Sequence, residues 1–159
     1  RAAGIEILSL WKAYSLPGWR IAFAVGDAGM VANLRRLKTN VDAGMFPALQ
    51  RAAIALLDAD PAERRAIAAV YERRRDLVLG LLRRAGLDVP TPRGGMYVWL
   101  PVPTGEPSLD FSLRLIEQAD VVVNPGSAYG AHGEGYVRLA LTVADARLAE
   151  GVERLLARC

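Results

Sequence analysis

SLWKAYSLPGWRIAFAVG, residues 9–26, is the stretch that decides how the first part of the chain folds. It holds the end of one short apolar run, IEILSL at 5–10, and the whole of a second, WRIAFAVG at 19–26. Each run is typical of a buried strand, and the Pro-Gly pair between them predicts a loop. The first strand then delivers Lys12 just beyond its carboxyl end, where open α/β sheets usually bind ligands.

The rest of the chain alternates between the periodicities of helices and strands. Helices are predicted over 27–40, 46–60, 61–86, 109–120 and 145–158, and strands over 95–100, 121–126 and 135–142. This alternation indicates the α/β class. We expect residues 1–60 to be part of one domain, 61–86 to be a long interdomain helix, and 87–159 to be a compact C-terminal domain.

Composition excludes several function classes. The 159 residues are 52% hydrophobic with a net charge of +3, and the excess arginines lie on predicted helix faces, so nucleic-acid binding is not expected. A lone Cys159 and a lone His132 predict neither a disulfide nor a metal site. No apolar run reaches the ~20 residues of a membrane span, so we expect a cytoplasmic protein that does not bind membranes. A strand pattern almost at Arg1 suggests the C-terminal part of a longer protein.

Lys12, Arg20 and Ser9 are the candidate site residues of the first region. Partly apolar surroundings lower the pKa of a lysine, because desolvation disfavours the charged form, and a neutral amine forms a Schiff base with an aldehyde. Arg20 begins an otherwise apolar strand, and its planar guanidinium suits a phosphate or a carboxylate. Ser9 offers a hydroxyl to the same anion. Taken singly, Lys12 also fits a surface loop, and Arg20 also fits an ion pair with a structural carboxylate.

Arg138 is the third unusual cation. In YVRLAL the alternation of a strand places Val137 and Leu139 on one face and Arg138 on the other. A mid-strand arginine among apolar residues is costly unless it faces a cleft and an anion, and a substrate carboxylate meets that need. The alternative is an arginine exposed on a solvent-facing sheet.

The region around this strand contains further aromatic residues and glycines. NPGSAYGAHGEGY, residues 124–136, predicts a mobile loop between two strands, and its glycine spacing is unlike that of a phosphate loop. Tyr97 in RGGMYVW is a candidate to face a cleft, whereas Trp99 is expected in the core. His132 is expected at the surface rather than as a catalytic base.

Taken together, these motifs have a family resemblance. SLWKAYSLPGWRIAFAVG resembles the active-site segment of fold-type I pyridoxal-phosphate aminotransferases of class I/II, whose usual form is S-x-S-K-x-x-x-x-x-G-W-R-x-G. YERRRDLVLGLL, PRGGMYVWLPVP and NPGSAYGAHGEGYVRLALT look like later landmarks of this family, in the expected order. The resemblance covers essentially the whole chain. It implies the C-terminal half of such an enzyme, in which part of the large cofactor domain is joined by the long helix to a compact C-terminal α/β domain.

The resemblance also implies roles for the candidate residues. Lys12 would form the Schiff base with pyridoxal 5'-phosphate, Ser9 and Arg20 would hold the cofactor phosphate, and Arg138 would bind the substrate α-carboxylate. The reaction implied is transfer of an amino group from an amino acid to a 2-oxo acid, with Lys12 as the general base at Cα. The segment at 38–50 is similar to one that reaches a neighbouring subunit, which implies a homodimer, and its wording is nearest to diaminopimelate- and alanine-type aminotransferases.

Two departures from the family pattern leave alternatives open. Trp11 stands where the family commonly has serine, and the N-terminal half, which should carry the partner of the pyridine nitrogen, is not in the sequence. We therefore expect little activity from these residues alone. A β-eliminating carbon-sulfur lyase would use the same lysine and arginines, and a non-catalytic regulatory domain built from aminotransferase parts is a third possibility.

Overall fold

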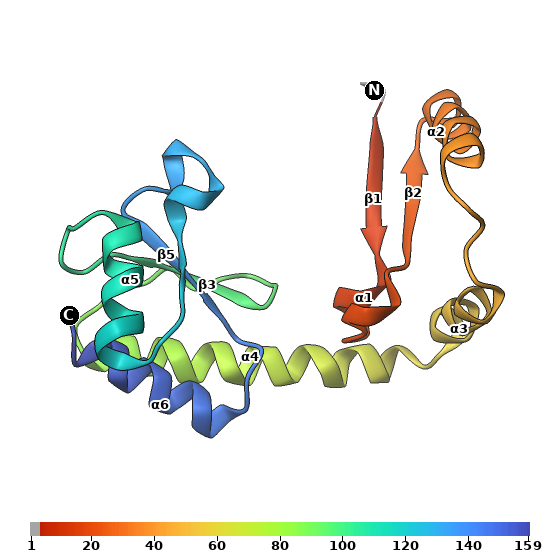
Figure 1. Ribbon diagram of the computed structural model, residues 1–159. Helices are drawn as coiled ribbons and strands as arrows, with labels where there is room; N and C mark the ends of the chain where they lie inside the picture. Colours follow the sequence, from red (N-terminus) through yellow and green to blue (C-terminus); the bar gives the residue numbers. More distant parts are fainter. Residues whose placement is uncertain (1–3) are drawn as a thin grey trace. The chain divides into compact units, whose positions relative to one another are not determined.

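The computed structural model describes residues 4–159, which form two compact units. The first unit ends at Ala68, and the second comprises Ala69–Cys159. Both combine helices with strands, as the α/β prediction requires, and every strand pair in the described residues is antiparallel (Figure 1). In the same residues, 4–159, no helix is long and apolar enough to cross a membrane.

The first unit contains a two-stranded ladder. Strand β1, Ile5–Ser9, pairs with β2, Ala22–Gly26, so that Ser9 lies opposite Ala22. The predicted loop between them is wrong in part, because it folds into helix α1, Leu10–Ala13, and the 3-10 turn η1, Pro17–Trp19. The second strand also begins three residues later than predicted, since η1 includes Trp19 and the chain is still turning at the next residue.

Two amphipathic helices follow β2, at the positions expected from the sequence. Helix α2, Ala28–Val41, begins at its N-cap residue Asp27, whose side chain accepts a 3.0 Å hydrogen bond from the backbone N–H of Met30. Helix α3, Pro47–Asp58, has a proline in its first turn, where the missing N–H costs nothing.

The long helix α4, Pro61–Arg84, contains residues of both units. It starts as the Asp-Pro pair predicts, because Asp60 Oδ1 accepts a 2.7 Å hydrogen bond from the Ala62 N–H. Its buried side chains all belong to the second unit and are Val78, Leu79 and Leu82. That α4 joins two domains, residues 1–60 and 87–159, remains a prediction.

The second unit is built on a three-stranded sheet. Strands β3, Tyr97–Pro101, β5, Tyr136–Ala140, and β4, Asn124–Pro125, lie in the order β3-β5-β4. Helices α5, Ser108–Ala119, and α6, Asp145–Leu156, complete the unit (Figure 1). One apolar core joins the sheet to these helices and to the end of α4, and its fully buried members include Val98, Leu100, Phe111, Leu115, Val137, Val152 and Leu155.

The two faces of β5 differ as the alternation predicts. Val137 and Leu139 are buried in the core, whereas Arg138 lies on the opposite face. Trp99 is directly opposite Arg138 in the sheet register and therefore shares its face. The prediction that Trp99 packs in the core is wrong: its side chain is half-buried and packs against Tyr129 and Tyr136 instead.

Strand β4 is much shorter than the predicted strand at 121–126. Asp120 adopts a left-handed conformation, φ 53°, that ends α5, and the Val121 N–H donates to the Leu115 carbonyl in a Schellman-type cap. The Val121 N–H is therefore used by the helix cap and is not available to a strand. Pro125 limits the strand further, because it has no N–H to donate to a ladder.

The segment expected to be a mobile loop is folded. Residues 126–135 contain two 3-10 turns, η2, Gly126–Tyr129, and η3, Ala131–Gly133. The two turns pack so closely that a Cβ added to Gly126 would lie 1.9 Å from the Gly133 carbonyl oxygen. His132 is exposed within η3, as predicted.

Candidate functional site

The first group of candidate residues lies at one end of the β1–β2 ladder. Ser9 is the last residue of β1, and the N–H of Leu10 donates a 3.2 Å hydrogen bond to the Ile21 carbonyl, which closes that end of the ladder. Arg20 precedes β2 at the same end, and Lys12 follows β1 within α1 (Figure 1). The fold of the first unit therefore brings Ser9, Lys12 and Arg20 to one region.

Arg20 has an unusual backbone conformation. Its φ of 51° and ψ of 40° are left-handed, which costs a residue with a Cβ about 1–2 kcal/mol. The side chain is exposed, and within the described residues of the first unit no hydrogen bond or ion pair joins its guanidinium to another group. Strain of this kind is concentrated at functional sites. An unpaired guanidinium in such a turn fits the phosphate of a cofactor.

Lys12 is exposed in the last turn of α1, and its amine is accessible to an aldehyde. Its Nζ lies 5.3 Å from the centre of the Trp11 ring, a cation–π contact. Trp11 therefore contacts the same amine that the resemblance makes reactive. Ser9 is half-buried, and its hydroxyl makes no capping bond to α1, which leaves it available to an anion.

The second group surrounds Arg138 on the outer face of the sheet. Its guanidinium carbon lies 4.0 Å from the centre of the Tyr97 ring and 4.7 Å from that of Tyr129. The Nε atom is buried and has no hydrogen-bond partner, the one such side-chain atom in residues 4–159. A buried, charged donor without an acceptor is costly, so this geometry favours an anionic ligand.

Aromatic packing holds the rings around Arg138. Trp99 stacks on Tyr136 with ring centres 5.7 Å apart, and it meets the edge of Tyr129 at 5.8 Å. Tyr129 had no signal in the sequence, because a turn rather than a strand delivers it to this face. Arg138 thus lies in an aromatic cluster. Tyr97 and Tyr129 contact its guanidinium, and Trp99 and Tyr136 pack beside them.

Glu134 and Asp145 are carboxylates of the second unit whose pKa values are lowered. Hydrogen bonds from the backbone N–H groups of Ser108 and Gly135 lower the pKa of Glu134. Hydrogen bonds from Arg73 and Arg74 lower the pKa of Asp145 to about 2. Within residues 4–159 neither carboxylate is hydrogen-bonded to Arg138, and each is held by its own partners.

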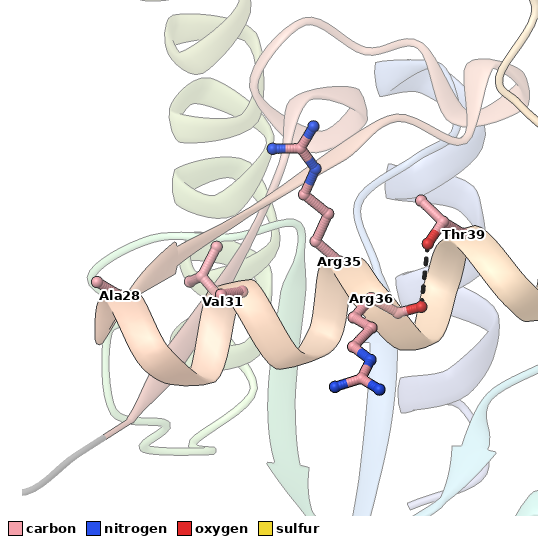
Figure 2. A pocket seen from close by; sticks show the side chains of 6 residues that line it. Ala28, Val31, Arg35, Arg36 and Thr39 are labelled. Atoms are coloured by element: carbon pink, nitrogen blue, oxygen red, sulfur yellow. Dashed lines mark hydrogen bonds between the residues drawn. The ribbon is translucent and has the colours of Figure 1, made fainter.

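A surface groove elsewhere in the first unit contains none of the predicted site residues. It runs along α2 and is lined by Ala28, Val31, Ala32, Arg35, Arg36 and Thr39 (Figure 2). Figure 2 shows the Thr39 hydroxyl bonded to the Arg36 carbonyl, at 3.0 Å, while both guanidinium groups point away from the helix. The groove is one exposed helix face, and its lining has no carboxylate, histidine or cysteine.

Comparisons with known proteins bear on both groups. Residues 5–155 match the family described as aminotransferase class I and II. LL-diaminopimelate aminotransferase 2 from Nostoc sp. is 46% identical over 151 residues, which are 95% of this chain and 39% of that protein. Among solved structures, an aminotransferase from Staphylococcus aureus is 38% identical with a TM-score of 0.91, over 96% of this chain and 41% of the other.

A third relative has the same architecture. A probable N-succinyldiaminopimelate aminotransferase from Thermus thermophilus is 33% identical with a TM-score of 0.91, over 98% of this chain and 42% of the other. The fold and motifs are thus those of part of a fold-type I aminotransferase. The chain belongs to the class I and II aminotransferase family, and it spans about 40% of the length of the relatives it matches.

Proposed function

We propose that this chain is the C-terminal part of an aminotransferase that moves an amino group from an amino acid to a 2-oxo acid. The observation that carries the proposal is the buried, unpartnered Nε of Arg138 between the rings of Tyr97 and Tyr129. A carboxylate is common to both substrates of such a reaction. Its two oxygens match the two N–H groups along one edge of a guanidinium, so Arg138 binds each substrate in turn.

The residues at the end of β1 and β2 serve the cofactor in this proposal. Bound pyridoxal phosphate supplies the electron sink that transamination needs. Lys12 would hold the cofactor aldehyde with its amine, and Ser9 and Arg20 would bind the cofactor phosphate. The Lys12 amine would also be the base that takes the proton from the substrate Cα. The strained turn at Arg20 and the lack of an ion-pair partner for its guanidinium among the described residues support this assignment.

The substrate, assembly and location are further parts of the proposal. LL-Diaminopimelate is the first amino donor to examine, because the 46% identical relative from Nostoc sp. carries that name. Exposed apolar side chains on the β1–β2 ladder, Ile7, Leu8 and Phe23 among them, support a longer protein in which other residues cover them. We also infer, from the family resemblance, a homodimer that works in the cytoplasm.

A turnover assay on the full-length protein tests this function. With pyridoxal phosphate, LL-diaminopimelate and 2-oxoglutarate, we expect glutamate to form. Lys12→Ala should reduce kcat by about 10²–10⁴-fold or more, because it removes both the covalent anchor and the base. Arg154→Ala, which removes an exposed cation paired with Glu150 on α6, is the control and should leave kcat unchanged.

Three results would contradict the proposal. Undiminished turnover by Lys12→Ala would exclude a catalytic amine at this position. With a β-thio amino acid such as cysteine in place of LL-diaminopimelate, release of thiol, pyruvate and ammonia without a newly aminated acceptor would indicate a β-eliminating lyase. Binding of substrates with no turnover at all would indicate a regulatory domain.

A further inference from the structure

A cluster of polar side chains lies beside the Arg138 face, and the proposed function does not use it. We call it the Ser108 junction; its members are Ser108, Ser127 and Glu134. Ser108 is fully buried in the first turn of α5, and its N–H donates a 2.7 Å hydrogen bond to Glu134 Oε1. Glu134 is 26 residues away in sequence, yet it caps a helix whose own N-cap residue, Pro107, has no side-chain acceptor.

The junction fastens both ends of the folded loop at 126–135. At one end, the Ser127 N–H donates a 3.2 Å hydrogen bond to Ser108 Oγ. At the other, Glu134 Oε2 accepts from the same Ser108 hydroxyl at 3.1 Å, and Glu134 Oε1 accepts from the Gly135 N–H at 2.9 Å. One buried serine therefore connects the start of the loop with its end. The close packing of Gly126 on Gly133 makes the loop compact between these points.

This loop carries Tyr129 to Arg138. Tyr129 is the last residue of η2, two positions after Ser127, and its ring is 49% exposed, so core packing does not fix it. Its ring nevertheless lies 4.7 Å from the Arg138 guanidinium and meets the edge of Trp99. The hydrogen bond of Ser127 to Ser108 fixes the backbone two positions before this ring.

We propose that Glu134 is a positioning residue for substrate binding: through Ser108 and Ser127 it holds the Tyr129 ring against Arg138 and so orients the guanidinium toward the substrate carboxylate. This rests on the proposed function of Arg138 as the carboxylate ligand. Because the carboxylate binds in both ground and transition states, loss of orientation raises KM more than it lowers kcat. Glu134 touches neither substrate nor cofactor in this account.

The test uses a double-mutant cycle in the full-length enzyme. Glu134→Gln keeps the shape of the side chain but removes its charge, and it should raise KM for both the amino donor and the 2-oxo acid by about 10-fold, with kcat within about twofold. Tyr129→Ala should also raise KM. In the Tyr129→Ala background, Glu134→Gln should add less than about twofold, because the ring it positions is gone.

Controls separate positioning from folding. Glu150→Gln removes a carboxylate that pairs with Arg154 on the surface of α6, and it should leave KM unchanged. If Glu134→Gln does not fold, Ser108→Ala replaces it: it retains the backbone bond to Glu134 but breaks the link to Ser127, so KM should rise as well. The melting temperature of each variant is measured beside its kinetics.

The outcomes distinguish this inference from the function on which it rests. The positioning role would be overturned if Glu134→Gln raised KM by the same factor in the unmodified enzyme and in Tyr129→Ala. It would also be overturned if Glu134→Gln lowered the melting temperature and left KM unchanged. If Arg138→Gln raises KM but neither Glu134→Gln nor Ser108→Ala does, only the inference fails. If Arg138→Gln leaves KM unchanged, the proposed function of Arg138 fails and the inference falls with it.

Discussion

The guanidinium carbon of Arg138 lies 4.0 Å from the centre of the Tyr97 ring, and the sheet register brings the two together. Tyr97 is opposite Ala140, so it is the diagonal neighbour of Arg138 on the same face of the sheet. The ring covers a face of the cation, and the buried Nε–H of the guanidinium has no acceptor within residues 4–159. A guanidinium held in this way loses less freedom when it binds a carboxylate.

Replacing Tyr97 tests the value of this contact. Tyr97→Leu keeps an apolar side chain but removes the aromatic face, and it should raise KM for the amino donor by about 3–10-fold, the strength of a partly desolvated cation–π pair. Tyr97→Phe keeps the ring and should leave KM unchanged. Steady-state kinetics of the full-length enzyme measures both. If the two variants were equally impaired, the phenol hydroxyl would be the important group.

The strained turn at Arg20 permits a separation of binding from stability. Arg20→Gly removes the guanidinium but relieves a left-handed φ of 51°, so the melting temperature of the apoprotein should rise or stay the same. The Kd for pyridoxal phosphate, measured by absorption titration, should rise by about 10–100-fold. Arg65→Ala, a change at an exposed helical arginine, is the control for charge alone. An unchanged Kd in Arg20→Gly would exclude Arg20 as the phosphate ligand.

The contact between Gly126 and Gly133 predicts a sharp effect on stability. A Cβ at position 126 would lie 1.9 Å from the carbonyl oxygen of Gly133 and 2.6 Å from that of Tyr136. Both obstacles are backbone atoms, so Gly126→Ala should lower the free energy of unfolding by about 2–3 kcal/mol or more. Chemical denaturation followed by circular dichroism measures the change.

Gly151 provides the opposite case. It lies within α6, and an added Cβ meets nothing within 4 Å. Gly151→Ala should therefore raise the free energy of unfolding by about 0.5–1 kcal/mol, because alanine favours the helix. If both alanine variants were equally destabilised, the close approach of the two turns would not be the cause.

The ion pairs of Asp145 predict a pH dependence of stability. Arg73 and Arg74 donate to this carboxylate at 2.8 and 3.0 Å, and they lower its pKa from 3.8 to about 2. A lowered folded-state pKa gives a stabilisation that is present above pH 3.8 and is lost as the pH falls toward 2. Asp145→Asn should lower the melting temperature by a few degrees at pH 7. Between pH 3.8 and about 2, the melting temperature of this variant should fall less than that of the unmodified protein.

The matched control for this experiment is Asp88→Asn, at an exposed aspartate that makes no ion pair within residues 4–159. It should keep both the melting temperature at pH 7 and the acid dependence. If Asp145→Asn lost as much stability between pH 3.8 and 2 as the unmodified protein, another carboxylate would be responsible.

Periodicity predicted the long elements well because it reports burial along many residues. The helices that begin at Ala28, Pro47 and Pro61 follow their caps and prolines, and the faces of β5 follow its strict alternation. The predictions fail where local turns interrupt these patterns. The short helix at Lys12 has too few residues to show a helical period. The left-handed conformation of Arg20 could not be predicted, because glycine is the residue type that usually marks that conformation.

The charged residues of the candidate site could be selected from the sequence, but the residues that surround them in the structure could not. Arg138 could be predicted from one strand, because an arginine amid apolar residues needs an anion. Tyr129 and Glu134 could not, because both lie in a loop whose ends are hydrogen-bonded to Ser108 of α5. The core position predicted for Trp99 was wrong, because the aromatic character of a strand residue does not indicate which face of the sheet it occupies.

Discrimination between substrates that have and lack a carboxylate tests the central claim most directly. We would measure kcat/KM for the active amino donor and for the amine without its α-carboxylate, in the full-length enzyme and in Arg138→Gln. The ratio of the two values should fall by about 100-fold in the variant, because only the amino acid loses a charge-assisted partner. An equal decrease for both substrates, which leaves the ratio unchanged, would contradict the assignment of Arg138 as the carboxylate ligand.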